Sequence, residues 1–220
     1  MGGCQPLILL PRVESAVPPK TKAERTRQPP KEIPIAQHDQ VRQDTLKWAR
    51  RLVSQRRPQV NGRSFRADCS GFIQALAYGV GLDLHSGASD KALRGSGVEL
   101  ISHYIENNGL SDLETPLPGD LVFFSNTYDK NRDGRLNDEL THIGVIESLH
   151  EDGTLSFIHH IRGRVQRGKI NLLKPMVHTE GNLVLNSYLR RRTTRDQKSI
   201  SYTAGSLFSG FGSFPVPRQY

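Results

Sequence analysis

Asp68-Cys69-Ser70-Gly71-Phe72 decides the fold, because it places a thiol where a polar turn gives way to an apolar helical pattern. The apolar residues that follow at helical spacing are Phe72, Ile73, Leu76, Ala77 and Val80. Cys69 is therefore expected in the first turn of a helix, where unpaired N–H groups stabilise a thiolate. Gly71 would let that helix pack closely against a neighbouring segment. The alternative is a buried structural cysteine, since free cysteine is among the most buried residue types.

Three later segments predict strands of an antiparallel sheet. Residues 118–120, Pro-Gly-Asp, predict a turn that leads into a buried strand over residues 121–124. A second strand is expected over residues 141–146, with a histidine near its start, and a third over residues 155–161, after a turn. A helix carrying a cysteine, followed by strands carrying histidines, is the nucleophile, base and orienting-residue order of papain-like enzymes. The expected fold class is α+β.

Four motifs in this order resemble those of NlpC-type cell-wall peptidases and the related CHAP amidohydrolases. They are Asp-Cys-Ser-Gly-Phe, Pro-Gly-Asp-Leu-Val-Phe-Phe, His-Ile-Gly-Val and Phe-Ile-His, between about Leu46 and His160. The resemblance implies a papain-like fold, in which the nucleophile-bearing helix packs on an antiparallel β-sheet. It also implies Cys69 as nucleophile, His142 as general base and His159 as the residue that orients the imidazole. The implied substrates are the peptide stems or cross-links of bacterial peptidoglycan.

The residues themselves favour the same assignment. A free thiol is only a few per cent thiolate at neutral pH, so an adjacent imidazole must take its proton and later deliver it to the leaving amine. Strand parity favours His159 over His160. With a turn centred at residues 152–153, Ile146 faces His159 and points to the same side as His142. That register separates the two histidines by about 13 Å along the strand, so a bulge or shifted pairing has to close the gap.

The substrate is less sharply defined by the sequence. Asp68 and Ser70 are candidates to line the substrate cleft. Many enzymes of the resembled family have a tyrosine and paired glycines shortly before the nucleophile, and residues 56–66 contain no tyrosine. Specificity for one stem bond therefore stays open, and an amidase that cuts elsewhere in the wall is equally compatible. The same fold would also suit an acyltransferase, a deamidase or a toxin, or a catalytically silent wall-binding module.

An acid-rich loop lies before the second strand. Residues 129–139 place oxygen-bearing side chains at alternate positions and Gly134 at the sixth, where an EF-hand loop makes its sharp turn. The twelfth position is Leu140 instead of glutamate. A structural Ca²⁺ that stiffens this segment is one interpretation, and a solvated turn is the other; the chemistry itself requires no cofactor. The candidate ligand positions are Asp129, Asn131, Asp133, Arg135, Asp138 and Glu139.

Composition divides the chain into three expected parts: a flexible tether over residues 1–37, a papain-like catalytic domain over 38–189 and a basic extension over 190–220. The tether contains seven prolines. Formal charge is +8 overall and concentrated after residue 160. Such a basic region could contact anionic envelope polymers or a lipid surface, or simply be solvated. Nucleic acid is a poorer candidate, because no helix-turn-helix, zinc-finger or RNA-recognition pattern is present.

Cys4 follows Gly3 as at a bacterial lipoprotein processing site, where the cysteine is lipidated. A charged and then an apolar segment normally precede such a site, and only Met1 and Gly2 precede the Gly3-Cys4 pair here. Either the natural start lies upstream or the likeness is accidental. A disulfide between Cys4 and Cys69 is not expected, and no stretch is long enough to span a bilayer. We expect an envelope protein, periplasmic or secreted, with Cys4 as its candidate lipid anchor.

Overall fold

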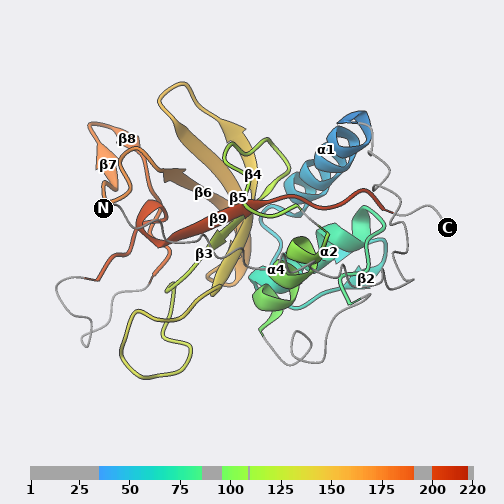
Figure 1. Cartoon of the computed structure of the whole chain (residues 1–220), viewed down its shortest axis with the longest axis horizontal. Coiled ribbons are helices and arrows are strands. Elements are labelled where there is room, and N and C mark those ends of the chain that lie inside the picture. Colours follow the sequence, from blue (N-terminus) through green and yellow to red (C-terminus); the bar gives the residue numbers. More distant parts are fainter. Residues whose placement is uncertain (1–34, 86–95, 109, 191–199, 218–220) are drawn as a thin grey trace, which may run out of the picture. The chain divides into compact units, whose positions relative to one another are not determined.

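The computed structural model describes residues 35–85, 96–108, 110–190 and 200–217, which contain three α-helices and a five-stranded antiparallel sheet (Figure 1). The helices are α1 (Ile35–Leu52), α2 (Cys69–Gly79) and α4 (Gly97–Asn107). The sheet has the order β6-β5-β4-β3-β9. Its strands are β3 (Leu121–Phe124), β4 (His142–Leu149), β5 (Thr154–Ile161), β6 (Arg164–Asn171) and β9 (Phe208–Gly212).

The chain also forms two short pairs of antiparallel strands outside this sheet. Strands β1 (Gln59–Val60) and β2 (Arg63–Ser64) form a hairpin before α2, and β7 (Thr179–Glu180) pairs with β8 (Leu183–Val184) after β6. A 3₁₀ turn, Gly205–Leu207, leads into β9. The predicted α+β arrangement, with the cysteine-bearing helix packed on an antiparallel sheet, is confirmed.

Side-chain caps fix where two of the helices begin. Asp68 is the N-cap of α2, and its Oδ1 accepts a hydrogen bond of 2.8 Å from the Gly71 N–H. Ser96 and Glu99 form a reciprocal capping box at the start of α4. Such caps satisfy N–H groups that have no partner inside the helix. The helix predicted after residue 68 is therefore present, and it begins at the cysteine itself.

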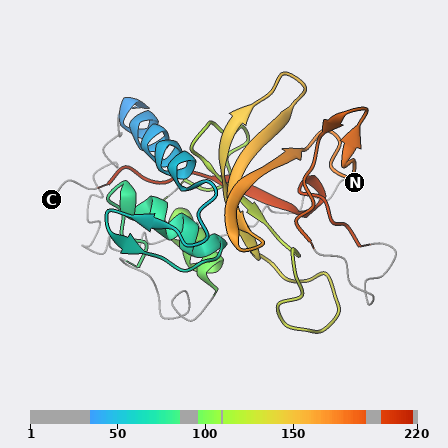
Figure 2. The same ribbon diagram turned by 180° about the vertical axis from the view of Figure 1, so that it is seen from behind.

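The sheet is covered on both faces. Helices α1, α2 and α4 lie together on one side of it in both views (Figures 1 and 2), where a core cluster includes Phe72, Ile101, Ile143 and Ile158. The opposite face is covered by the segment that leads to β9. Its cluster includes Phe124, Ile146, Phe157, Leu189, Ala204 and Leu207. Each such fully buried large side chain stabilises the fold by about 1.5–3 kcal/mol relative to exposure.

The predicted boundary at residue 190 is wrong. Strand β9 pairs with β3 along its length, from Leu121 opposite Gly212 to Phe124 opposite Phe208, so the C-terminal region completes the catalytic sheet. Arg190 is not part of a solvated surface either. It is buried, and its Nη1 donates a hydrogen bond of 2.8 Å to the carbonyl oxygen of Asn126. Arg191 and Arg192, which follow it in the sequence, lie outside the described residues.

The N-terminal boundary also differs from the prediction. The chain divides into two units after residue 32, and α1 begins at Ile35, inside the expected tether. Cys4 lies outside the described residues. None of the described helices is long and apolar enough to cross a membrane.

Candidate functional site

Cys69 is the first residue of α2 and lies against the beginning of β4. Its thiol is free and half-buried. The backbone N–H of Ile143 donates a hydrogen bond to the sulfur, and the N–H groups of Ser70 and Cys69 add to it. Since Ile143 directly follows His142, the fold brings the predicted nucleophile to the strand position beside the predicted base.

The protonation state of Cys69 differs from the expectation based on its helical position. The pKa of the thiol is raised from 9.0 to about 11, first by burial and then by the nearby Asp68 carboxylate, against three backbone N–H groups that lower it. Burial and the negative charge of Asp68 therefore raise the thiol pKa by more than the N–H groups at the start of α2 lower it. At neutral pH the cysteine keeps its proton, so attack on a substrate requires a base that removes it.

His142 begins β4 and is buried beside Phe124, with 6.0 Å between ring centroids. Burial lowers the pKa of its imidazole from 6.5 to about 4, and His160 contributes in the same direction. A neutral imidazole has one ring nitrogen without a proton. His142 can therefore accept a proton at neutral pH.

His159 is joined to that imidazole directly. The distance between His142 Nε2 and His159 Nδ1 is 2.8 Å. Burial lowers the pKa of His159 well below its usual value, with further lowering by His142, His160 and Arg162. His160 points elsewhere, and its Nε2 donates to the Arg56 carbonyl at 2.8 Å. Of the two adjacent histidines, the structure thus brings His159 to His142, as strand parity predicts.

A β-bulge sets this pairing. The β4–β5 register changes between Ile146 and Ser148, so Ile146 lies opposite Phe157 and Val145 opposite Ile158. The expected pairing of Ile146 with His159 is therefore wrong, whereas the bulge or shift that the sequence required is present. The ladder places His159 next to Gly144, only two residues from His142. A Cβ on Gly144 would lie 3.3 Å from the His159 Cβ and 2.9 Å from the Phe157 ring.

Glu147 occupies the bulge and is clamped from both sides. Its carboxylate accepts from Arg50 Nε of α1 at 3.1 Å and from Arg167 of β6 at 2.6 and 3.0 Å. Burial works against ionisation of Glu147, but the two arginines hold its pKa below the usual range. The clamp ties the irregular point of β4 to its neighbours. Sequence reasoning missed this residue because a bulge has no distinct pattern.

Three residues next to Cys69 shape its surroundings: Ser70 and Gly71 are buried, and the Asp68 carboxylate is partly exposed. Ser70 is 5% exposed and donates to Asp68 Oδ1 at 2.8 Å, so it braces the helix cap instead of lining a cleft as expected. Asp68 Oδ2 pairs with Arg66 at 2.9 Å, and its side chain is partly exposed. Gly71 packs as predicted, because a Cβ there would lie 2.2 Å from the Arg66 carbonyl oxygen.

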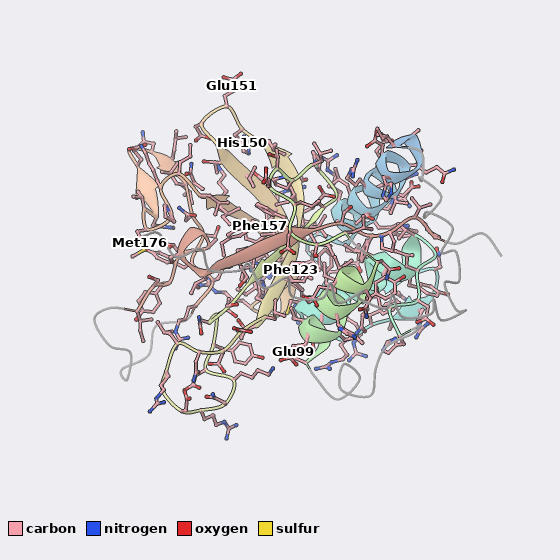
Figure 3. All side chains as sticks on the ribbon, in the orientation of Figure 1. Glu99, Phe123, His150, Glu151, Phe157 and Met176 are labelled. Carbon is pink, nitrogen blue, oxygen red and sulfur yellow. The ribbon has the colours of Figure 1, made fainter. Side chains whose placement is uncertain are left out.

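The loop between β3 and β4 connects the acid-rich segment to the site. Lys130 pairs at 2.7 Å with Glu99 of α4, the residue labelled in Figure 3. Tyr128, a half-exposed residue of the same loop, has its pKa raised by burial and, to a smaller extent, by the negative charge of a Cys69 thiolate. Within the described ranges, no three His, Cys, Asp or Glu side chains gather closely enough to hold a metal ion.

A cavity of about 380 Å³ lies between α4, β3, β9 and the same loop. Its lining includes Phe123, which pairs with Ile143 across the sheet, and the carboxylates of Glu106, Asp112 and Glu139. Glu139 thus lines this cavity. No local pattern signals the cavity, because its walls come from segments that are far apart in the chain.

Comparison with known proteins agrees with this geometry. The model of the NlpC/P60 family matches residues 55–181, more than half of the chain, and the match includes Cys69, His142 and His159. Neither the comparison with curated proteins nor that with solved structures gives a match.

Proposed function

Because this chain belongs to the NlpC/P60 family of peptidoglycan-hydrolysing cysteine peptidases, we propose that it cleaves an amide bond of the stem peptide or its junction, as an endopeptidase or amidase. The observation that carries the proposal is the 2.8 Å hydrogen bond between His142 Nε2 and His159 Nδ1, on the strand that meets Cys69. This hydrogen bond would hold the His142 imidazole in one orientation, so that it can act as the base for the protonated Cys69 thiol.

Acylation follows from this arrangement. His142 takes the Sγ proton at Nδ1, the ring nitrogen not engaged by His159, as the sulfur attacks the carbonyl carbon. Backbone N–H groups near Cys69 hold the oxyanion, a contribution of about 3 kcal/mol per donor in comparable sites. The His142 imidazolium then delivers the proton to the leaving amine, the C–N bond breaks, and a thioester to Cys69 remains.

Deacylation reverses the order of proton transfers. Neutral His142 takes a proton from water while the water oxygen adds to the thioester carbonyl. The C–S bond breaks, the sulfur regains its proton from His142, and a carboxylic acid is released. During both halves His159 Nδ1 accepts from His142 Nε2–H, which keeps the reactive nitrogen directed at the sulfur.

Surface features favour a cationic substrate group and an envelope location. Glu106, Asp112 and Glu139 around the cavity next to β3 would attract an amine-bearing part of a stem peptide. Since the substrate polymer lies outside the cytoplasm, we propose a periplasmic or secreted location, with lipidation at Cys4 as the means of attachment. The basic C-terminal region would favour contact with anionic envelope polymers or lipid head groups.

The test is mass spectrometry of soluble products from purified peptidoglycan, incubated with wild type and with Cys69→Ala. We expect new fragments from wild type alone, and their masses name the bond. Circular dichroism checks that Cys69→Ala keeps the fold. Fragments from both proteins would overturn the cysteine mechanism. No fragments from a wild-type protein whose thiol reacts normally would overturn the substrate, and parallel incubation with acyl donors and amine acceptors would then reveal a transferase.

A further inference from the structure

The β3–β4 loop is curled by backbone N–H groups that donate to its own side chains. Asp129 Oδ2 accepts from the Gly134 N–H at 2.9 Å, Asn131 Oδ1 from the Asp133 N–H at 2.9 Å, and Asp133 Oδ1 from the Arg135 N–H at 2.8 Å. Gly134 has φ +75°, a conformation that glycine adopts without strain. The loop therefore has one tight turn with its oxygen-bearing side chains at alternate positions.

The polar side chains of this turn also contact one another. Asn131 Nδ2 lies 3.1 Å from Asp133 Oδ2 and 3.4 Å from Asn137 Oδ1, while Asn137 Nδ2 donates to Asp133 Oδ2 at 2.9 Å. Asp138 is drawn to the same place, because its Oδ1 accepts from the Asn131 N–H at 3.3 Å. Side chains from both halves of the loop thus converge.

Two oxygens of this cluster are buried without a hydrogen-bond partner: Oδ2 of Asp138 and Oδ1 of Asp129. Asp138 is only 5% exposed, so water cannot compensate its charge fully. A buried polar group without a partner destabilises the fold, and a charged one does so more strongly. Two such atoms in one loop indicate a missing electrostatic partner.

We propose that this loop binds one calcium ion, with Asp138 supplying the carboxylate that the twelfth position of an EF-hand loop would otherwise supply. The further ligands are the side-chain oxygens of Asp129, Asn131 and Asp133 and the backbone carbonyl of Arg135. An all-oxygen set that mixes carboxylate, amide and carbonyl suits calcium, whereas zinc prefers nitrogen and sulfur ligands and magnesium a stricter octahedron.

Like charge explains why the three carboxylates do not already form a tight cluster. Asp133 Oδ2 is held by the amide groups of Asn131 and Asn137, which keep it away from the other two aspartates. Calcium would replace those amide contacts and draw the carboxylates together. Glu139 takes no part, because its exposed side chain lines the cavity instead.

The ion would stiffen a segment that reaches the catalytic residues. Asp138 and Asn126 pair through two hydrogen bonds at the base of the loop, of 2.7 and 2.8 Å. Thr127 and Thr141 pair one step closer to the sheet, at 2.9 Å, and Thr141 directly precedes His142. Calcium would therefore order the loop that carries Tyr128 without taking part in proton transfer.

Terbium luminescence on the full-length, chelator-treated protein tests the proposal without any substrate. Tyr128 directly precedes Asp129, so excitation of tyrosine should sensitise a terbium ion bound in the loop. We expect saturable emission that calcium displaces, with magnesium far weaker as a competitor. Tyr128→Phe should remove most of the emission, while calorimetry still detects calcium binding.

Two adjacent substitutions give a matched comparison. Asp138→Asn should weaken calcium binding at least tenfold, whereas Glu139→Gln should leave it unchanged. Calcium should raise the melting temperature of wild type and of Glu139→Gln but not of Asp138→Asn. Without calcium, Asp138→Asn should be at least as stable as wild type, because it removes a buried carboxylate whose Oδ2 has no hydrogen-bond partner. The proposal is overturned if wild type shows no saturable binding up to about 1 mM calcium, or if both variants lose binding equally.

Discussion

His142 and His159, 17 residues apart in the chain, share a hydrogen bond of 2.8 Å through Nε2 of the first and Nδ1 of the second. The direction of this bond decides whether His142 can act as a base. If His142 Nε2 carries the proton and donates it, Nδ1 is left unprotonated and can accept the thiol proton. His159 must then be neutral, which agrees with the strong lowering of its pKa by burial.

Removing the acceptor at position 159 should therefore impair turnover more than binding. We expect His159→Ala to lower kcat by about 10²-fold or more with little change in KM, because the tautomer and ring orientation of His142 are lost. His159→Asn should recover much of this loss, since its amide oxygen can accept the same proton. His150→Asn, at an exposed histidine in the β4–β5 turn (Figure 3), is the control. Equal kcat for His159→Ala and wild type would exclude the orienting role.

A methyl group at Gly144 should displace the histidine beside it. Gly144→Ala puts a Cβ 3.0 Å from the Ile158 carbonyl oxygen and 3.3 Å from the His159 Cβ. We expect a loss of about 1–3 kcal/mol in the free energy of unfolding, together with lower kcat. Gly210→Ala in β9 is the matched control for stability, because nothing lies within 4 Å of the place that its Cβ would take. Equal losses of stability in both variants, or an unchanged kcat in Gly144→Ala, would contradict this explanation.

The cysteine should react slowly with alkylating agents at neutral pH. With a thiol pKa of about 11 instead of 9.0, the thiolate fraction at pH 7 is about a hundredfold smaller than that of an ordinary cysteine. The rate of iodoacetamide labelling, followed by intact mass, should rise steeply above pH 9. A plateau between pH 5 and 8 would indicate a preformed thiolate and imidazolium pair instead.

Acid should destabilise the protein through its buried histidines. The pKa of His142 is about 4 in the folded state and about 6.5 when unfolded, so the unfolded state binds more protons between these values. Stability from this group is complete above pH 6.5 and falls as pH drops toward 4, by about 3 kcal/mol. Urea unfolding measured between pH 7.5 and 4 should show this slope. His142→Gln should flatten it, and an unchanged slope would mean that other groups cause the acid sensitivity.

Much of the site could be predicted from local pattern. The polar turn before Cys69, the apolar spacing after it and the apolar run that follows Pro-Gly-Asp at residues 118–120 are local signals, and local signals survive in a single sequence. The resemblance in four ordered motifs also identified the family that the comparison shows. His159 could be chosen over His160 because side chains alternate between the two faces of a strand, so only one of two adjacent histidines can face His142.

What could not be predicted depends on distant parts of the chain. The register of β4 and β5 depends on a bulge at Glu147, and the two arginines that hold Glu147 come from α1 and β6. The thiol pKa depends on how deeply the folded protein buries Cys69, which no local pattern encodes. Strand β9 was missed because three of its five residues are serine or glycine, a weak strand signal.

The pairing of β3 with β9 has a consequence for how the chain is made. Strand β3 lies inside the sheet, but the neighbour on one of its sides comes from residues 208–212, which are synthesised long after β3 itself. Until then, β3 presents an unpaired and wholly apolar edge, the kind that recruits other nascent chains. Contacts of such long sequence separation also form slowly. The edge of β3 therefore stays open until β9 pairs with it, and chains cut short before Phe208 should aggregate.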